Sequence, residues 1–358
     1  RREPRFSGRG GSFWGSGSAC QIISGMSSFG ILHLSDLHFR EKTSPDGLLG
    51  PLREDLKCFS HIPLKFVVVS GDLTDRGSPL GFRKAEEFLR GLQELVDVPF
   101  HDFVICPGNH DVETVAGAMK LEESVGPEDD VVQQLADDVF RVAVPGEYGR
   151  RFTGFAELCK NLLGYEFDLS NLWRVQTCHK RRLQFITLNS AYRIDQYRRK
   201  NAAIDAAAFS RALRKADNDL PSGSDPVLRI AVWHHGVLGT DAMAGAEPFL
   251  GRLAPQGITI LLHGDVHETR AEIFQPFRDS VYVLGAGSYS ANPTDRPPGI
   301  GNLYNFIEIR SDLGWVTVHV RQQERPGGAF DGLYAWGPKS GRRPNFGFVR
   351  GQAAFGEW

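Results

Sequence analysis

Along this chain, from Gly30 onward, a short aliphatic run is repeatedly followed by Asp, His or Asn. The runs span residues 31–34, 66–69, 103–105, 183–188, 228–233 and 258–262. Helical patterns separate several of them, as over residues 82–95 and 205–216, where apolar side chains recur every three or four positions. Strands that alternate with helices predict an α/β fold built around a β-sheet.

The polar side chains form clusters directly after the predicted strands. The clusters are Asp36 with His38, Asp72 with Asp75, Asn109 with His110 and Asp111, His234 with His235, and Asp265 with His267. In open α/β sheets, ligands gather at the carboxyl ends of strands. Carboxylates, imidazoles and an amide, with no thiolate, suit Mn, Fe, Zn, Ni or Mg. The candidates outnumber the four ligands of a closed zinc site, and a carboxylate shared by two ions about 3.5–4 Å apart supports displacement at phosphorus. We therefore expect two divalent metal ions.

Composition excludes several other classes of protein. Lys and Arg number 41 against 43 Asp and Glu, so a net charge of -2 gives no electrostatic reason to expect a general polyanion-binding protein. No apolar run approaches the roughly 18 residues of a membrane span. The 5 cysteines are widely spaced and form no CxxC pair, which argues against a disulfide framework or a thiolate zinc site. We expect a reducing, cytoplasmic location.

The motifs DxH, GDxxD, GNHD, HH and GxxH occur in this order, and the match covers roughly residues 30–320. Together they resemble the calcineurin-like metallophosphoesterase superfamily. The resemblance implies an α/β fold, a four-layer αββα sandwich of two mixed β-sheets flanked by helices, with a dinuclear metal centre at the strand ends. Similar modules occur beside NTPase or sensor domains in bacteria, so fusion to or association with such a module is a further expectation.

The resemblance also implies roles for individual side chains. Asp36, His38 and His267 would hold the first metal ion, Asp72 would bridge, Asn109 and His234 would hold the second, His110 would protonate the leaving oxygen, and Asp111 would orient the His110 ring. His234 is favoured over His235 because adjacent residues of a strand point to opposite faces.

Two positions depart from the family pattern. Gly236 stands where Pro is common, and Asp265 stands where the family usually has His. Asp265 could ligate the second ion through a carboxylate oxygen, which favours a harder metal such as Mn or Mg. Alternatively the second site is weak, and activity is reduced or absent.

The leading hypothesis is a metal-dependent phosphodiesterase that hydrolyses a nucleotide or nucleic-acid phosphodiester. A hydroxide bound to two metal ions would attack phosphorus, with His110 as general acid and Mn²⁺ as the favoured ion. One alternative is a phosphomonoesterase, either a nucleotide or a protein phosphatase; Asp75 and Arg76 resemble the DRG of phosphoprotein phosphatases, whose Arg contacts phosphate. The alternative of another class is a catalytically weak or silent metal-binding module, because of Asp265.

The chain divides into three parts and an insertion. Residues 1–29 predict a disordered or non-native Gly/Ser-rich extension, with Met26 as the expected biological start. Residues 30–322 form the expected metallophosphoesterase domain, interrupted over 112–163 by an insertion of mostly helical pattern. Residues 323–358 are rich in Gly, Pro and aromatic side chains and predict an irregular tail packed on the domain.

Overall fold

The computed structural model describes residues 27–349 apart from 128, 168, 170–171, 224, 239–241, 276–279 and 337–340, together with 355–356. Most of the extension expected over residues 1–29 lies outside these residues. Its end does not, because the first strand already begins at Ser28. In the part of the chain that the structure describes, no helix has both the length and the apolar character needed to span a membrane.

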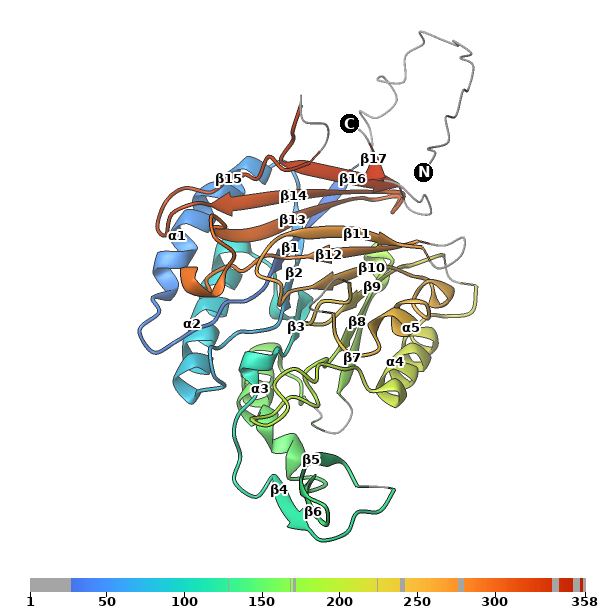
Figure 1. The fold of residues 1–358 in the computed structure, drawn as a ribbon. Coiled ribbons are helices and arrows are strands. Elements are labelled where there is room, and N and C mark those ends of the chain that lie inside the picture. The colour runs from blue at the N-terminus through green and yellow to red at the C-terminus, as the bar shows by residue number, and fades with distance from the viewer. Residues whose placement is uncertain are drawn as a thin grey trace, which may run out of the picture.

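Two mixed β-sheets form the centre of the fold (Figure 1). The first sheet has the order β17 (Phe355–Gly356), β16 (Asn345–Val349), β14 (Trp315–Gln323), β13 (Asn302–Arg310), β1 (Ser28–Leu34), β2 (Leu64–Ser70) and β3 (Phe103–Cys106), with β15 (Asp331–Gly332) also paired to β14. The second has the order β11 (Arg270–Phe274), β12 (Val281–Gly285), β10 (Ile258–His263), β9 (Leu228–Val232), β8 (Leu183–Leu188) and β7 (Trp173–Cys178). All six aliphatic runs identified in the sequence are strands of these sheets.

Parallel pairing brings the ends of the polar-tipped strands together. β1, β2 and β3 pair in parallel in the first sheet, and β8, β9, β10 and β12 do so in the second. Antiparallel strands extend both sheets, with β13 next to β1, β7 next to β8 and β11 next to β12. The loops after β1, β2 and β3 therefore leave one edge of the first sheet together, as those after β9 and β10 leave one edge of the second.

Helices cover the outer faces of the two sheets (Figure 1). The helices are α1 (Pro45–Leu56), α2 (Pro79–Val96), α3 (Thr153–Leu158), α4 (Ala206–Asn218) and α5 (Ala246–Leu250). Side chains alternate along the strands: Ile31 and Phe66 face the core between the sheets, whereas Leu32 and Val67 pack with α1 and α2. A third core lies between the second sheet, α4 and α5. The expected four-layer αββα sandwich is confirmed.

The helices form where the apolar spacing predicted them. In α2, Phe82, Ala85, Phe88 and Leu89 are buried along one face. The helix starts at Pro79, whose fixed φ suits the first helical position, and the Ser78 hydroxyl accepts a hydrogen bond from the backbone N–H of Gly81 at 3.0 Å. Asp205 caps α4 in the same way. These caps set where each chain segment leaves the sheet edge.

The expectation of a helical insertion over residues 112–163 is wrong for its first half. That half is a three-stranded antiparallel sheet in the order β4 (Met119–Glu122), β6 (Val139–Ala143) and β5 (Val131–Ala136), which projects from the sandwich (Figure 1). Few of its side chains are buried, Val132 and Val142 among them, so the sequence carries little period-two signal. The second half is helical, with α3 followed by a π-helical turn over Cys159–Leu163.

Arginines of low exposure attach this insertion to the sandwich. The Arg198 guanidinium lies 2.9 Å from an Asp130 oxygen and 3.0 Å from an Asp195 oxygen. Arg151 is 1% exposed and donates hydrogen bonds to backbone carbonyls, including that of Tyr192 at 2.8 Å. The insertion is therefore tied to the loop that follows β8.

The expectation of an irregular tail over residues 323–358 is also partly wrong. Within its described residues, β16 pairs antiparallel with β14 and extends the first sheet. Phe346 and Phe348, two positions apart, face the core between the sheets with exposures of 7% and 1%. The glycines and prolines around them hid this short alternating segment from sequence analysis.

Candidate metal centre

The five polar clusters come from loops of both sheets and meet at one edge of the sandwich. The loops after β1, β2 and β3 supply Asp36, His38, Asp72, Asn109 and His110, and those after β9 and β10 supply His234, Asp265 and His267. Backbone contacts join the two sets. The N–H of Asp265 donates to Asp36 Oδ2 at 3.2 Å, and His234 Nδ1 donates to the carbonyl of Ser70 at 2.7 Å. All seven predicted metal ligands are thus brought together.

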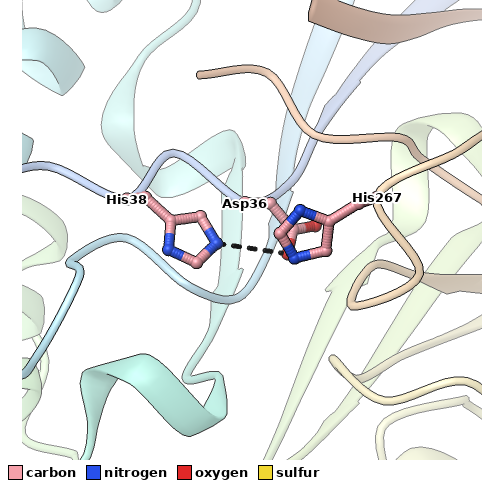
Figure 2. A group of neighbouring side chains, drawn as sticks. All are labelled: Asp36, His38 and His267. Carbon is pink, nitrogen blue, oxygen red and sulfur yellow. Dashed lines mark ion pairs between the residues drawn. The ribbon is translucent and has the colours of Figure 1, made fainter. Parts of the chain in front are cut away.

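Asp36, His38 and His267 form the first ligand group (Figure 2). Asp36 Oδ1 lies 3.6 Å from His38 Nε2 and 3.5 Å from His267 Nε2, too far for a hydrogen bond. Both Asp36 Oδ1 and His38 Nε2 are buried and have no hydrogen-bond partner among the described residues. Buried polar atoms normally have partners, and atoms at this spacing around a common point fit coordination of a cation.

Asp72, Asn109, His234 and Asp265 form the second group. His234 Nε2 lies 3.0 Å from Asn109 Oδ1, 3.2 Å from Asp72 Oδ2 and 3.9 Å from Asp265 Oδ1. The Ser70 carbonyl can only accept a hydrogen bond, so His234 Nδ1 carries a proton and Nε2 faces the three oxygens. Asp72 Oδ2 also lies 3.6 Å from His38 Nε2. One carboxylate therefore faces both groups.

The electrostatics of the cluster call for positive charge. Burial raises the pKa of Asp36, but His38, His267 and His234 outweigh it and lower the pKa to about 2. Burial lowers the pKa of His234, yet Asp72 raises it well above the usual value. Burial, with Asp36 and Asp72, raises the pKa of Asp265 to about 6 against the effect of His234. Protons on histidines compensate these buried carboxylates, and divalent cations would replace those protons.

Backbone strain is concentrated at the same residues. The described non-glycine residues with positive φ include Asp36 (φ 53°), His38 (47°), Asp72 (53°), Asp265 (69°) and His267 (54°). Left-handed backbone is uncommon for non-glycine residues and costs on the order of 1–3 kcal/mol where the structure imposes it. Its repetition in both DxH segments turns each pair of side chains toward the same point.

Gly108 shows how tightly the loops approach. A Cβ at this position would lie 2.0 Å from Asp72 Oδ1 and 2.4 Å from the backbone nitrogen of Asp72. The glycine of the GNHD segment is therefore required because the carboxylate of a different loop occupies the space. That carboxylate oxygen also accepts the backbone N–H of His110 at 2.8 Å.

His110 lies at the rim of the cluster, with its side chain 39% exposed. Its Nδ1 donates to the backbone carbonyl of Asp75 at 2.7 Å, and the Asp75 carboxylate lies 3.8 Å from the same nitrogen. The His110 ring is 4.6 Å from the His38 ring, centroid to centroid. Nε2 of His110 is left for a contact outside this network.

Asp111 does not make the contact with the His110 ring that the family pattern implied. Its carboxylate accepts backbone N–H groups from Gly108 at 2.9 Å, Leu73 at 3.1 Å and Thr74 at 2.8 Å, and the Thr74 hydroxyl at 3.1 Å. Asp111 thus fastens the loop after β3 to the loop after β2. The residue that sequence reasoning missed as the partner of the ring is Asp75, and its presence in GDxxD was the available signal.

His235 lies beyond the end of β9, so the rule of alternating strand faces does not apply to it. One of its ring nitrogens lies within 4.8 Å of ligand atoms of His234 and Asp265. The Ser190 hydroxyl accepts the backbone N–H groups of both histidines at 3.2 Å, so it donates its own proton to His235 Nδ1 at 2.7 Å. His235 Nε2 then carries the proton, which favours His234 as the ligand for a different reason than expected.

A two-sheet α/β sandwich that gathers Asp, His and Asn side chains at its strand ends defines a metallohydrolase type of site. Residues 29–269 match the family model described as calcineurin-like phosphoesterase. The chain belongs to this family of phosphoester hydrolases.

Comparison with solved structures supports the fold. The purple acid phosphatase from yellow lupin (Lupinus luteus) seeds superposes with a TM-score of 0.52 at 11% identity, covering 91% of this chain and 54% of the lupin chain. The sulfate thiohydrolase SoxB of Thermus thermophilus gives a TM-score of 0.38 at 13% identity, covering 79% of this chain and 53% of that chain. This chain therefore spans about half the length of either protein. Comparison with curated proteins by sequence gives no match.

Proposed function

We propose that this chain is a phosphodiesterase that acts on a nucleotide or nucleic-acid phosphodiester with two divalent cations. The proposal is carried by the position of Asp72, whose Oδ2 lies 3.6 Å from His38 Nε2 and 3.2 Å from His234 Nε2. A carboxylate between two ligand groups is the feature that a cation pair needs.

The residues present fit such a pair of cations. Asp36, His38, Asp72 and His267 would hold the first, and Asp72, Asn109, His234 and Asp265 the second. When bound, divalent cations supply a nucleophilic hydroxide near neutral pH and neutralise charge on the phosphoryl oxygens. Asp265 gives the second position one more carboxylate oxygen, and for that reason we propose Mn²⁺ as the native ion.

The chain's own contribution to bond cleavage comes from His110. With Nδ1 donating to the Asp75 carbonyl, the protonated ring presents a proton on Nε2 from the rim of the cluster. That proton passes to the ester oxygen as its bond to phosphorus breaks, so the leaving group departs as an alcohol. General-acid assistance of this kind contributes about 10²- to 10⁴-fold, and most for poor leaving groups.

The arginines near the site support a diester over a monoester. A dianionic monoester is well matched by a free arginine fork. Arg40 already uses its fork on Asp75, with two N–O distances of 3.0 Å. Arg76, the expected candidate for a phosphate contact, is 88% exposed, and its Nε lies 3.6 Å from Asp75. A singly charged diester needs less compensation.

The proposal is tested on protein loaded with Mn²⁺, Zn²⁺ or Mg²⁺. We expect two ions per chain by elemental analysis, and faster hydrolysis of bis-p-nitrophenyl phosphate than of p-nitrophenyl phosphate. Cyclic nucleotides, single-stranded DNA and RNA then identify the substrate class. We expect His110→Asn to keep both ions and lose about 10²-fold or more on unactivated diesters, while Asp72→Ala loses metal. His101→Asn, at a side chain 77% exposed, is the matched control.

Each other outcome selects another function. Faster hydrolysis of the monoester would replace the diesterase with a phosphomonoesterase. One ion per chain and no hydrolysis with any metal would indicate a silent metal-binding module, in which Asp265 fails to hold the second cation. Equal activity of His110→Asn and wild type on an unactivated diester would reject the general-acid role.

We also propose a reducing, cytoplasmic compartment. It is supported by Cys58, Cys106, Cys159 and Cys178, which are all free thiols. An associated NTPase or sensor module is a prediction from the family resemblance alone.

A further inference from the structure

Arg40 makes a contact that neither the family motifs nor the ligand groups account for. It follows His38 by two residues in the loop after β1, and its side chain is 42% exposed. Its Nη2 donates to Asp75 Oδ1 at 3.0 Å, and its Nε lies 3.0 Å from Asp75 Oδ2. This two-point arginine–carboxylate pair fixes both the position and the plane of the Asp75 carboxylate.

The carboxylate held in this way lies between two functional rings. Asp75 Oδ1 is 3.8 Å from His38 Nδ1 and 3.8 Å from His110 Nδ1. His38 Nδ1 is buried and has no hydrogen-bond partner among the described residues. At 3.8 Å the carboxylate favours positive charge on either ring but forms a hydrogen bond with neither. Its distance from the two rings is therefore the quantity that Arg40 controls.

Arg40 is itself anchored from a third loop. With the Asn292 amide oriented to satisfy its surroundings, the amide oxygen accepts Arg40 Nη1 at 2.5 Å and Nη2 at 2.7 Å. Asp295 Oδ2 lies 3.7 Å from Arg40 Nη2. Asn292 and Asp295 belong to the loop after β12, which also holds the first ligand loop through the Ser288 hydroxyl and the Asp36 carbonyl at 3.1 Å. The guanidinium thus joins the loops that follow β1, β2 and β12.

We propose that Arg40 is a positioning residue for the general acid, which acts through Asp75 on the His110 ring. This inference rests on the proposed phosphodiesterase function. Arg40 keeps the carboxylate between the two rings, and the Asp75 backbone carbonyl that accepts His110 Nδ1 belongs to the same clamped residue. Loss of the clamp frees the carboxylate to turn toward either ring, and His110 loses the orientation that directs Nε2 to the leaving oxygen.

The kinetic test compares Arg40→Gln, Arg40→Lys and Arg76→Gln on aryl diesters whose leaving groups range from good to poor. Arg76 is the matched control because it approaches the same carboxylate by one contact at 3.6 Å. We expect Arg40→Gln to lower kcat by about 10- to 100-fold on poor leaving groups, with little effect on good ones and with KM and metal content unchanged. Arg40→Lys should recover part of the loss, and Arg76→Gln should match wild type.

A double-mutant cycle with Asp75→Asn tests the route. If Arg40 acts through Asp75, Arg40→Gln should have no further effect in the Asp75→Asn background. Additive losses would overturn the proposal, as would a loss of equal size for all leaving groups or a change in KM alone. Those results would assign Arg40 to direct substrate contact or to general stability.

A readout without turnover separates this inference from the proposed function. Imidazole nitrogen NMR, with the His110 signals assigned by their absence in His110→Asn, reports whether the ring holds its proton on Nδ1. We expect one tautomer in wild type and Arg76→Gln and a mixture in Arg40→Gln. A single unchanged tautomer in Arg40→Gln would refute the positioning role, even in a protein that hydrolyses nothing. Absence of hydrolysis beside the expected NMR change would count against the proposed function only.

Discussion

Replacement of Gly108 by alanine tests whether the cluster depends on close approach of two loops. The added Cβ would lie 2.0 Å from Asp72 Oδ1, whereas ordinary van der Waals contact begins at 3.4 Å. The carboxylate must therefore retreat by about 1.4 Å, which is most of a metal–oxygen bond of roughly 2.0–2.2 Å. Because Asp72 faces both ligand groups, both cation positions are affected.

The retreat has a cost in stability as well as in metal binding. Asp72 Oδ1 loses the backbone N–H of His110, now at 2.8 Å, and a hydrogen bond to a charged group contributes about 1.5–3 kcal/mol. We expect Gly108→Ala to unfold at lower denaturant by about that free energy. Its cation affinity should fall by more than the about 10- to 100-fold that follows loss of an outer partner.

Calorimetric titration with Mn²⁺ and urea unfolding of the metal-free protein measure the two effects. Gly50→Ala is the control, because Gly50 lies in α1 and a Cβ there meets nothing within 4 Å. That variant should gain about 0.5–1 kcal/mol of stability and bind cations as wild type does. If Gly108→Ala binds two cations with unchanged affinity, the loops do not define the site as argued here.

Three further perturbations address the second cation and the insertion. Asp265→His should shift the preference of the second position from Mn²⁺ toward Zn²⁺, measured by competitive metal loading. Affinity for the second cation should rise with pH, because the pKa of Asp265 is raised to about 6 and that of His234 lies well above its usual value, so bound protons must leave first; titrations across this range measure it. Arg198→Ala should leave the buried Asp195 short of a partner at 3.0 Å, lower stability by about 1–3 kcal/mol and speed hydrogen exchange in β4, β5 and β6.

Each of these has an outcome that contradicts it. An unchanged metal preference in Asp265→His would mean that residue 265 is not a ligand. Affinity for the second cation that is flat with pH would mean that His234 and Asp265 do not exchange protons for a cation. Exchange in the insertion that stays at the wild-type rate in Arg198→Ala would show that other contacts hold that sheet.

The strands and the gathering of the ligands could be predicted because both follow from burial. An aliphatic run such as 66–69 must be covered on both faces, and a polar side chain directly after it has only the sheet edge to occupy. Asp36 and His267 could therefore be placed together although most of the chain separates them. Their spacing of 3.5 Å, by contrast, depends on left-handed backbone at both residues, which no composition or period reveals.

The rest of the site could not be predicted because it depends on which donors reach which carboxylate. Asp75 and Asp111 both had a claim on His110, and Asp111 is adjacent to it in sequence. The Asp111 carboxylate is taken up by backbone N–H groups that only the folded loops bring to it. The sheet of the insertion escaped notice for a different reason, since a mostly exposed strand such as β5 needs no apolar alternation.

The metal centre and the packing of the two sheets are parts of one energetic problem. The first sheet supplies Asp36 and Asp72 and the second supplies His234 and Asp265, so any cation held between them cross-links the sheets at this edge. Without cations, few contacts cross there, among them the 2.7 Å bond from His234 to the Ser70 carbonyl. Buried carboxylates would then repel one another unless the histidines keep their protons. The same residues that make hydrolysis possible thus set how firmly the two halves of the sandwich are joined, and strained backbone at the ligands is tolerated because coordination stabilises what the chain alone does not.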